Sequence, residues 1–384
     1  MLFGVTAEQL AIRETALLFA REKLAPKAGQ WDRDKQFPVD ILRQAAALGF
    51  AAINAREEFG GVGLKRFDSV LIFEALATGC PSIAAYLSVH NMCVWMIDAF
   101  GSETQRRAYL PRLCAMESLS SYCLTEPGSG SDAAALRTRA ERRGDDYVLN
   151  GEKQFISGAG ASGPEHIYVV MARTGGEGPG GVSALLVHGG TPGLTLGAAE
   201  RKMGWNAQPT HAVSFENCRV PSQNLLGGEG AGFKIAMAAL DGGRLNIGAC
   251  SLGGGQAALD RAIVYMRERK AFGRRLDEFQ ALQFKLADMA TELEAARALL
   301  WRAATALDAR APDATTLCAM AKCVATDAGF VVANEALQLH GGYGYLADYG
   351  IEKIVRDLRV HQILEGANEI MRVIVARSLL ETRR

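Results

Sequence analysis

The chain has 384 residues, a length at which we expect about two or three domains. Its 42 basic and 42 acidic side chains cancel, which argues against proteins that bind nucleic acid or a membrane surface through their overall charge. Eight cysteines without a Cys-x-x-Cys pair and six histidines without a His-x-x-x-His pair argue against a disulfide framework and a zinc site. We therefore expect a soluble globular protein with buried, reduced cysteines and no bound metal.

Residues 1–118 are predicted to form a helical domain. Residues 6–9 and 102–105 both match the capping box that begins a helix, and Phe37-Pro38 opens another helix. Polar residues interrupt the apolar stretch 82–100, so we expect a buried helix there instead of a membrane span. Because no apolar leader is recognised before the first helix, we expect a bacterial-type cytoplasmic protein, or a mitochondrial matrix protein if the chain is a processed eukaryotic one.

Residues 119–226 consist of short β-rich runs, which predict a small antiparallel barrel or sandwich. Asn150-Gly151 is typical of a type I′ turn, so we expect a hairpin between strands at 147–149 and 152–157. The Gly-x-Gly-x-x-Gly run at 158–163 precedes a proline and a strand-like run, not a helix, so we interpret it as a loop and not as a dinucleotide site. Further strands are expected at 167–172, 182–187 and 212–215.

Residues 227–384 are again predicted to be helical, as a helical bundle. Between 282 and 300 the apolar residues recur at alternating spacings of four and three, as in a coiled-coil seam. A subunit interface and an internal core stripe are equally compatible with this pattern. The residues of the seam are Leu282, Leu286, Met289, Leu293, Ala296 and Leu300.

Near the C-terminus, Glu365 follows two apolar residues and precedes Gly366. A carboxylate in dry surroundings has a raised pKa and becomes a base able to remove a weakly acidic C–H proton. Taken alone, however, the segment fits an ordinary turn with a solvated glutamate better. Asn368 is the expected N-cap of the helix that follows. The apolar face of that helix is expected to contain Met371, Val375 and Leu379.

Other segments favour contacts with a flat, anionic cofactor, each with a plainer alternative. Residues 122–132 form a Pro-Gly-Ser turn that exposes backbone N–H groups, and 155–157 combine an aromatic ring with a hydroxyl. The basic cluster at 267–275 fits either a phosphate clamp or a solvated helix end. The glycines of 340–345 either allow close approach of a ligand or end a helix.

Six motifs in chain order make the sequence resemble the acyl-CoA dehydrogenase family over nearly its full length. The resemblance implies FAD as cofactor and an α+β multidomain fold: an N-terminal all-α domain, a central β-barrel domain and a C-terminal four-helix bundle. It also implies an acyl-CoA substrate, an electron-transferring flavoprotein as electron acceptor, and a homotetramer. The motifs are YCLTEPGSGSD (122–132), NGEKQFIS (150–157), LGGEGAGF (226–233), RKAFG (269–273), LQLHGGYGY (337–345) and ILEGANEI (363–370).

By position, the resemblance makes Glu365 the base that removes the α-proton of the thioester while the flavin accepts the β-hydrogen. Ala367 stands where relatives often carry Ser or Thr, so a hydroxyl contact to FAD is missing. The implied FAD contacts are Tyr122, Leu124, Thr125, Gly130, Ser131, Phe155, Ile156, Ser157, Arg269, Phe272, Phe279, Gln280, then Gln338, Leu339, His340, Gly341 and Gly342 from a neighbouring subunit, and Ala367, Asn368 and Glu369. The implied acyl-CoA contacts are Ser131, Asp241, Gly242, Gly243, Arg244, Gly366 and Arg377.

Alternatives within the same fold remain open. The runs 202–206 and 360–380 are most similar to enzymes for a short α-branched acyl group, with straight butyryl and 2-methylbutyryl groups as alternatives. Isovaleryl and long-chain branches carry their base near 241–244, where two glycines leave only Asp241. Flavin monooxygenases typically lack Glu365, DNA-binding flavoproteins carry an extra basic region, and acyl-CoA oxidases are usually longer, so these are less favoured.

Overall fold

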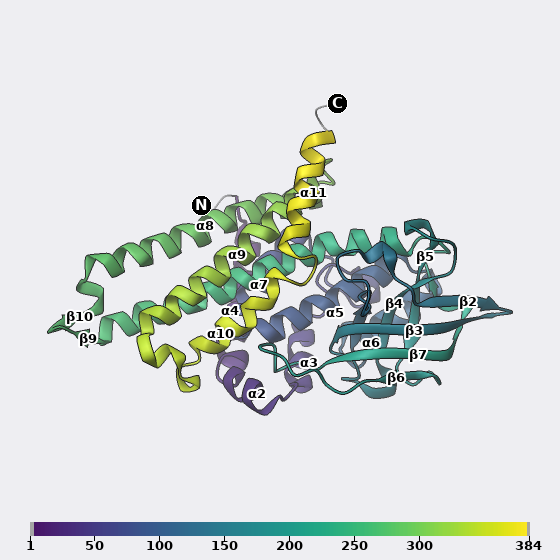
Figure 1. The fold of residues 1–384 in the computed structure, drawn as a ribbon, viewed down its shortest axis with the longest axis horizontal. Helices are drawn as coiled ribbons and strands as arrows, with labels where there is room; N and C mark the ends of the chain where they lie inside the picture. Colours follow the sequence, from purple (N-terminus) through teal and green to yellow (C-terminus); the bar gives the residue numbers. More distant parts are fainter. Residues whose placement is uncertain (1–3, 382–384) are drawn as a thin grey trace.

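The computed structural model describes residues 4–381. Long helices reach one end of the elongated molecule, where the short hairpin β9 (Lys270–Ala271) and β10 (Arg274–Arg275) lies, and the main β-sheet occupies the opposite end (Figure 1). Helix α11 (Asn368–Glu381) projects from the middle of the body and carries the C-terminus (Figure 1). Helical regions on both sides of a central sheet in the sequence confirm the predicted α+β architecture.

The N-terminal region consists of helices whose first turns follow from local sequence. The hydroxyls of Thr6 and Ser102 accept hydrogen bonds from the amides of Gln9 and Gln105, each at 3.2 Å, which confirms both predicted capping boxes. Pro81 occupies the first turn of α5, where its missing N–H is not needed. The elements are α1 (Ala7–Phe19), the π-helix η1 (Ala20–Leu24), α2 (Ala28–Asp34), α3 (Val39–Ala47), α4 (Arg66–Gly79), α5 (Pro81–Phe100) and α6 (Glu103–Cys114).

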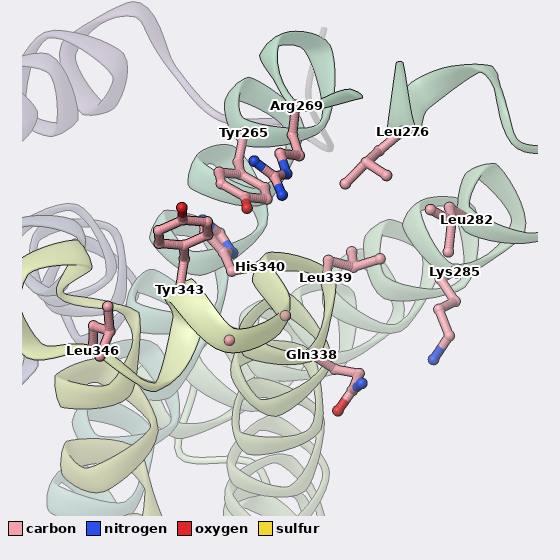
Figure 2. A pocket seen from close by; sticks show the side chains of 12 residues that line it. Tyr265, Arg269, Leu276, Leu282, Lys285, Gln338, Leu339, His340, Tyr343 and Leu346 are labelled. Carbon is pink, nitrogen blue, oxygen red and sulfur yellow. The ribbon is translucent and has the colours of Figure 1, made fainter. Parts of the chain in front are cut away.

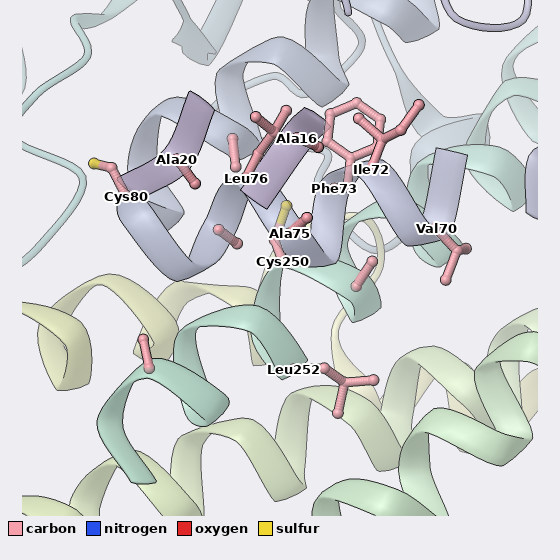
Figure 3. Close-up of a cluster of buried hydrophobic side chains, with 14 of the residues drawn as sticks. Ala16, Ala20, Val70, Ile72, Phe73, Ala75, Leu76, Cys80, Cys250 and Leu252 are labelled. Carbon is pink, nitrogen blue, oxygen red and sulfur yellow. The ribbon is translucent and has the colours of Figure 1, made fainter. Parts of the chain in front are cut away.

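The largest hydrophobic core joins this region to the long helix α7 (Gly232–Glu268). In Figure 3, Cys250 of α7 lies close to side chains of α4 such as Ala75, and Leu252 of α7, in the same core, lies farther from α4. The two helices cross closely because Gly253 lacks a side chain: a Cβ there would lie 2.1 Å from the carbonyl oxygen of Glu74. This crossing fixes α7, and with it the residues that α7 contributes to the site below.

The middle region is an eight-stranded sheet with the order β6-β7-β3-β2-β4-β5-β8, and β1 adds parallel to β4. The strands predicted at 167–172 and 182–187 are confirmed, and the one at 212–215 extends over twelve residues. The strands are β1 (Ser120–Cys123), β2 (Arg139–Arg143), β3 (Asp146–Ser157), β4 (Ile167–Arg173), β5 (Val182–His188), β6 (Leu194–Leu196), β7 (Thr210–Pro221) and β8 (Leu225–Leu226).

The prediction of a hairpin turn at Asn150-Gly151 is wrong, because β3 runs straight through both residues. The chain reverses earlier, at 144–145, between β2 and β3. Gly151 has φ +147°, lies where the register of β3 against β7 shifts, and has Thr138 so close that a Cβ would meet its hydroxyl oxygen at 2.6 Å. Asn-Gly here serves a β-bulge, which has the same need for a glycine as a tight turn.

The C-terminal region contains the long helices α7, α8 (Gln280–Asp308) and α9 (Ala314–His340), followed by α10 (Ile351–Arg359) and α11. The seam on α8 is an internal core stripe from Met289 onward, because Met289, Leu293, Ala296 and Leu300 are at most 3% exposed. The 158–163 run is a loop followed by β4, as predicted.

By length and composition, α5 and the segment Ala314–Tyr345 are long and apolar enough to cross a membrane. Most of the apolar window of each is buried inside the protein, and α5 is the buried helix predicted for 82–100. All eight cysteines are free and buried, as predicted. Within residues 4–381, no cluster of three His, Cys, Asp or Glu side chains could hold a metal.

Candidate active site

A cavity of about 370 Å³ lies where α5, α7, the sheet and the turn before α11 meet; we call it the base cavity. Helices α5 and α7 line it with apolar side chains, and the loop after β1 lines it with small and hydroxyl-bearing residues. It brings together Glu365, Gly366 and Arg244 with the predicted cofactor residues of the middle region. The latter are Tyr122, Leu124, Thr125, Gly130, Ser131, Phe155, Ile156 and Ser157.

Glu365 enters the base cavity from a turn with an unusual backbone. Glu365 has φ +55° and Gly366 has φ +89°, so two successive residues are in the left-handed region, where a glutamate is rare. The residue is partly exposed, but its Oε2 atom is buried and has no hydrogen-bond partner among the described residues. Room for the carboxylate comes from α7, because a Cβ at Gly243 would lie 2.6 Å from Oε2.

Desolvation by burial raises the pKa of Glu365 to about 7, and the nearby charges of Arg244 and Lys322 oppose this rise. A carboxylate with this pKa is ionised above neutral pH yet remains a far stronger base than a solvated glutamate. The sequence-based alternative of a solvated glutamate is therefore not what the structure shows. A carboxylate with such a pKa is chemically able to act as a base toward a group held in the base cavity.

Of the predicted acyl-CoA residues on α7, Arg244 lines the base cavity, whereas Asp241, Gly242 and Gly243 lie next to it along the helix and are not among the lining residues. Arg244 pairs with Asp241 at 2.8 Å, and the other oxygen of Asp241 accepts from the hydroxyl of Thr315 at 2.7 Å. Gly242 faces Arg66, whose Nη1 would lie 2.5 Å from a Cβ at that position. Arg377, in contrast, is exposed on α11 and does not line the base cavity.

The base cavity has features that suit a flat, hydrogen-bonding ring system. The hydroxyl of Tyr122 is buried and, like Glu365 Oε2, has no partner among the described residues. Phe155 presents an aromatic ring that is 64% exposed, on a backbone with φ +61°. Beneath this surface a buried Lys153–Glu126 ion pair of 2.7 Å fixes the loop after β1, since Lys153 also donates to the carbonyl of Leu124. These residues fit FAD, which the sequence implies.

A second cavity of about 550 Å³ lies at the far ends of α7 and α9; we call it the cationic cavity (Figure 2). The Arg269 guanidinium lies 5.4 Å from the ring centre of Tyr343, and the rings of Tyr265 and His340 stack at 4.4 Å. Its lining residues include cations but no carboxylate, which suits an anionic group and not proton removal. It is larger than the base cavity but lacks a base. The predicted cofactor residues that line it are Arg269, Gln338, Leu339, His340, Gly341 and Gly342, all in one chain.

The remaining predicted cofactor residues line neither cavity. Phe272 is 94% exposed on the β9–β10 hairpin, where its ring makes an edge contact with Phe279, 6.4 Å between centres. Gln280 begins α8 beside them. Ala367, Asn368 and Glu369 lie directly after the Glu365 turn. The side chain of Asn368 bonds to α9, and the helix begins at Asn368 itself, so the predicted N-cap role is not seen.

Two residues were not predicted from the sequence: Trp205, which lines the base cavity, and Lys322, which lies beside the Glu365 turn. The indole N–H of Trp205 donates to His361, whose other ring nitrogen bonds the hydroxyl of Ser251 at 2.6 Å. Lys322 is fully buried beside the Glu365 turn. A single lysine in the otherwise apolar run 317–323 was a usable signal, because a charge inside a core helix requires a partner. No comparable signal marks the pairing of Trp205 with His361.

Comparison with known proteins shows that nearly the whole chain matches the domains of one protein family. Residues 6–117, 121–218 and 230–380 match the N-terminal, middle and C-terminal domains of acyl-CoA dehydrogenase. The chain is 55% identical over 378 residues to the mitochondrial isobutyryl-CoA dehydrogenase of Bos taurus. It is 54% identical over 377 residues to the mitochondrial isobutyryl-CoA dehydrogenase of Dictyostelium discoideum. Each alignment covers 98% of this chain and 90% of the relative. It matches the structure of butyryl-CoA dehydrogenase from Megasphaera elsdenii with a TM-score of 0.94 and 38% identity, over 99% of this chain and 100% of that one.

Proposed function

The chain belongs to the acyl-CoA dehydrogenase family and is an oxidoreductase of that kind, and we propose that it oxidises isobutyryl-CoA to methacrylyl-CoA, a step of valine breakdown, with FAD as cofactor and Glu365 as base. One observation carries the assignment of the base. Glu365 is the carboxylate of the base cavity whose Oε2 is buried without a partner within residues 4–381 and whose pKa is raised to about 7.

In this proposal Glu365 removes the α-proton of the thioester. Bound FAD would supply the acceptor for the β-hydrogen, which leaves as a hydride. The carboxylate is held over Gly243, whose missing side chain lets it reach the cavity. The apolar side chains of α5 and α7 exclude water, which keeps the base desolvated and strengthens every charge interaction at the reacting carbon.

The base cavity suits the ring system of a cofactor and the cationic cavity suits its anionic end, so the two cavities together support a long cofactor with both parts. The loop after β1 and residues 155–157 would contact the flavin ring, and Tyr122, whose buried hydroxyl has no partner among the described residues, lines the same cavity. Arg269 and residues 338–342 would hold a diphosphate and adenine end. Because the family is expected to be homotetrameric, we propose that the cationic cavity serves the cofactor of a neighbouring subunit.

Substrate choice rests on the relatives named isobutyryl-CoA dehydrogenase at 55% and 54% identity. Butyryl-CoA and 2-methylbutyryl-CoA are the closest alternatives, because one methylene changes binding by only about 1–3 kcal/mol. We further propose an electron-transferring flavoprotein as the electron acceptor. A cytoplasmic location fits a bacterial chain, and the mitochondrial matrix fits a processed eukaryotic one.

The decisive experiment is an anaerobic titration of the purified protein with isobutyryl-CoA, butyryl-CoA and isovaleryl-CoA, followed by flavin absorbance. We expect rapid bleaching that is fastest with isobutyryl-CoA. Faster bleaching by another acyl-CoA would overturn the choice of substrate. A yellow protein that none of them bleaches would contradict the dehydrogenation, and a colourless protein would contradict the assignment of FAD.

A further inference from the structure

The turn that carries Glu365 is held from helix α9. Glycine tolerates the left-handed region but a glutamate there is energetically unfavourable, so other contacts must maintain the backbone at Glu365. The ammonium group of Lys322 donates to the carbonyl oxygen of Gly366 at 2.8 Å and to the amide oxygen of Asn368 at 2.9 Å. Lys322 therefore contacts the chain immediately after the base and also the first residue of α11.

Asp327, one turn farther along α9, extends this support to both sides of the turn. Its Oδ1 accepts from Gln362, before Glu365, and from Asn368, after it, each at 2.7 Å. Thr326 adds a hydroxyl that accepts from Asn368 at 3.0 Å. The segment between 362 and 368 is thus anchored at both ends to one face of α9, with Lys322 bonded between the anchors.

Lys322 differs from the other charged groups around Glu365 in how its charge is balanced. Arg244 of α7 also faces Glu365, but its charge is compensated by the ion pair with Asp241. Tyr122 of β1 and Cys93 of α5, two further titratable groups near Glu365, are neutral because burial raises their pKa values, and Asp132 in the loop after β1 also lines the base cavity. Within residues 4–381, Lys322 makes no ion pair, and its two bonds are to neutral oxygens.

We propose that Lys322 is a positioning residue for the base: its ammonium group fixes the left-handed turn of Glu365, and its positive charge, which has no ion-pair partner among the described residues, favours the ionised form of the carboxylate. A buried cation that lacks an acidic partner has a pKa below its usual range, and the pKa of Lys322 is lowered to about 8 by burial, with Glu365 as the main opposing charge. At neutral pH the lysine is still protonated. This inference rests on the proposed role of Glu365.

The test is the pH profile of flavin reduction by isobutyryl-CoA under anaerobic conditions, measured by stopped flow. Lys322→Gln keeps a donor but removes the charge, so the acidic limb of the profile should move up by about one pH unit. Thr326→Val weakens the anchoring of Asn368 but keeps every charge. The rate of flavin reduction should therefore fall, while the acidic limb of the pH profile stays at the same pH. Lys23→Gln removes an exposed lysine of η1 and serves as the control with an unchanged profile.

Asp327→Asn gives a prediction of opposite sign that does not depend on the folding of a Lys322 variant. Loss of this partly exposed anion leaves the charge of Lys322 less balanced, so the acidic limb should move to lower pH by a few tenths of a unit. A limb that stays at its original pH in both Lys322→Gln and Asp327→Asn would overturn the inference. If the unmodified protein is not bleached at any pH, the proposed function fails instead, and the two failures are thereby distinguished.

Discussion

The base cavity and the cationic cavity show two opposite uses of burial. In the base cavity a carboxylate is placed among apolar helices with its Oε2 atom buried, and desolvation raises its pKa to about 7. In the cationic cavity Arg269 stays exposed, stacked on an aromatic ring, and Lys285 is paired with Glu335. Proton removal requires a desolvated, poorly compensated charge, whereas binding an anion requires an accessible one. The same chain builds both by placing them at different ends of α7.

Glu365→Gln should give the largest effect, because it removes the base and leaves the shape of the base cavity unchanged. We expect flavin reduction to slow by about 10⁴-fold, while FAD content and acyl-CoA binding persist. Rapid-mixing absorbance measures the rate of flavin reduction, and equilibrium titration measures acyl-CoA binding. Reduction at more than a tenth of the original rate would contradict the role of Glu365.

Lowering the pH should affect the base cavity and leave the cationic cavity unaffected. The pKa of Glu365 is raised to about 7, so the ionised, active form is lost as the pH falls through that value. At pH 5 about one part in a hundred remains ionised, and reduction should be about 100-fold slower than on the plateau at high pH. The measurement is the reduction rate per bound flavin from pH 5 to 9. A flat profile would disprove the raised pKa.

Gly243→Ala tests whether the space on α7 positions the carboxylate. The new Cβ would lie 2.6 Å from Oε2, so the carboxylate must move, and reduction should slow on the order of 10- to 100-fold. Gly29→Ala on α2, where a Cβ meets nothing within 4 Å, is the matched control and should retain full activity. A crystal structure of Gly243→Ala with an undisplaced Glu365 would rule this explanation out.

Arg269→Ala should give the smallest effect on the chemistry and act on the cationic cavity alone. Loss of a charge-assisted contact is worth about 1.5–3 kcal/mol, so FAD should be released at least about 10-fold more readily on dialysis. The rate per remaining flavin should be unchanged. The exposed Arg142→Ala on β2 is the control. If flavin occupancy matches that of the control, Arg269 does not hold the cofactor.

Local sequence was sufficient to predict those structural features that depend on residues close together in the chain. Both capping boxes and the buried helix at 82–100 depend on residues a few positions apart, and all three predictions are confirmed. The Asn150-Gly151 prediction failed because a turn and a β-bulge demand the same backbone from glycine, and only the pairing of β3 with β7 distinguishes them. The N-cap prediction for Asn368 failed because a partner on α9 binds its side chain.

By itself, the sequence determined the order of helical and β-rich regions, the family, and Glu365 as the candidate base, since each is written in periodicity or in contiguous motifs. Only the tertiary structure decided that this glutamate is desolvated, because its surroundings come from α5, α7, α9 and the sheet. It also revealed Lys322, 43 positions earlier in the chain, beneath the turn of the base. Burial and electrostatic coupling depend on distance in space, which spacing along a chain does not specify.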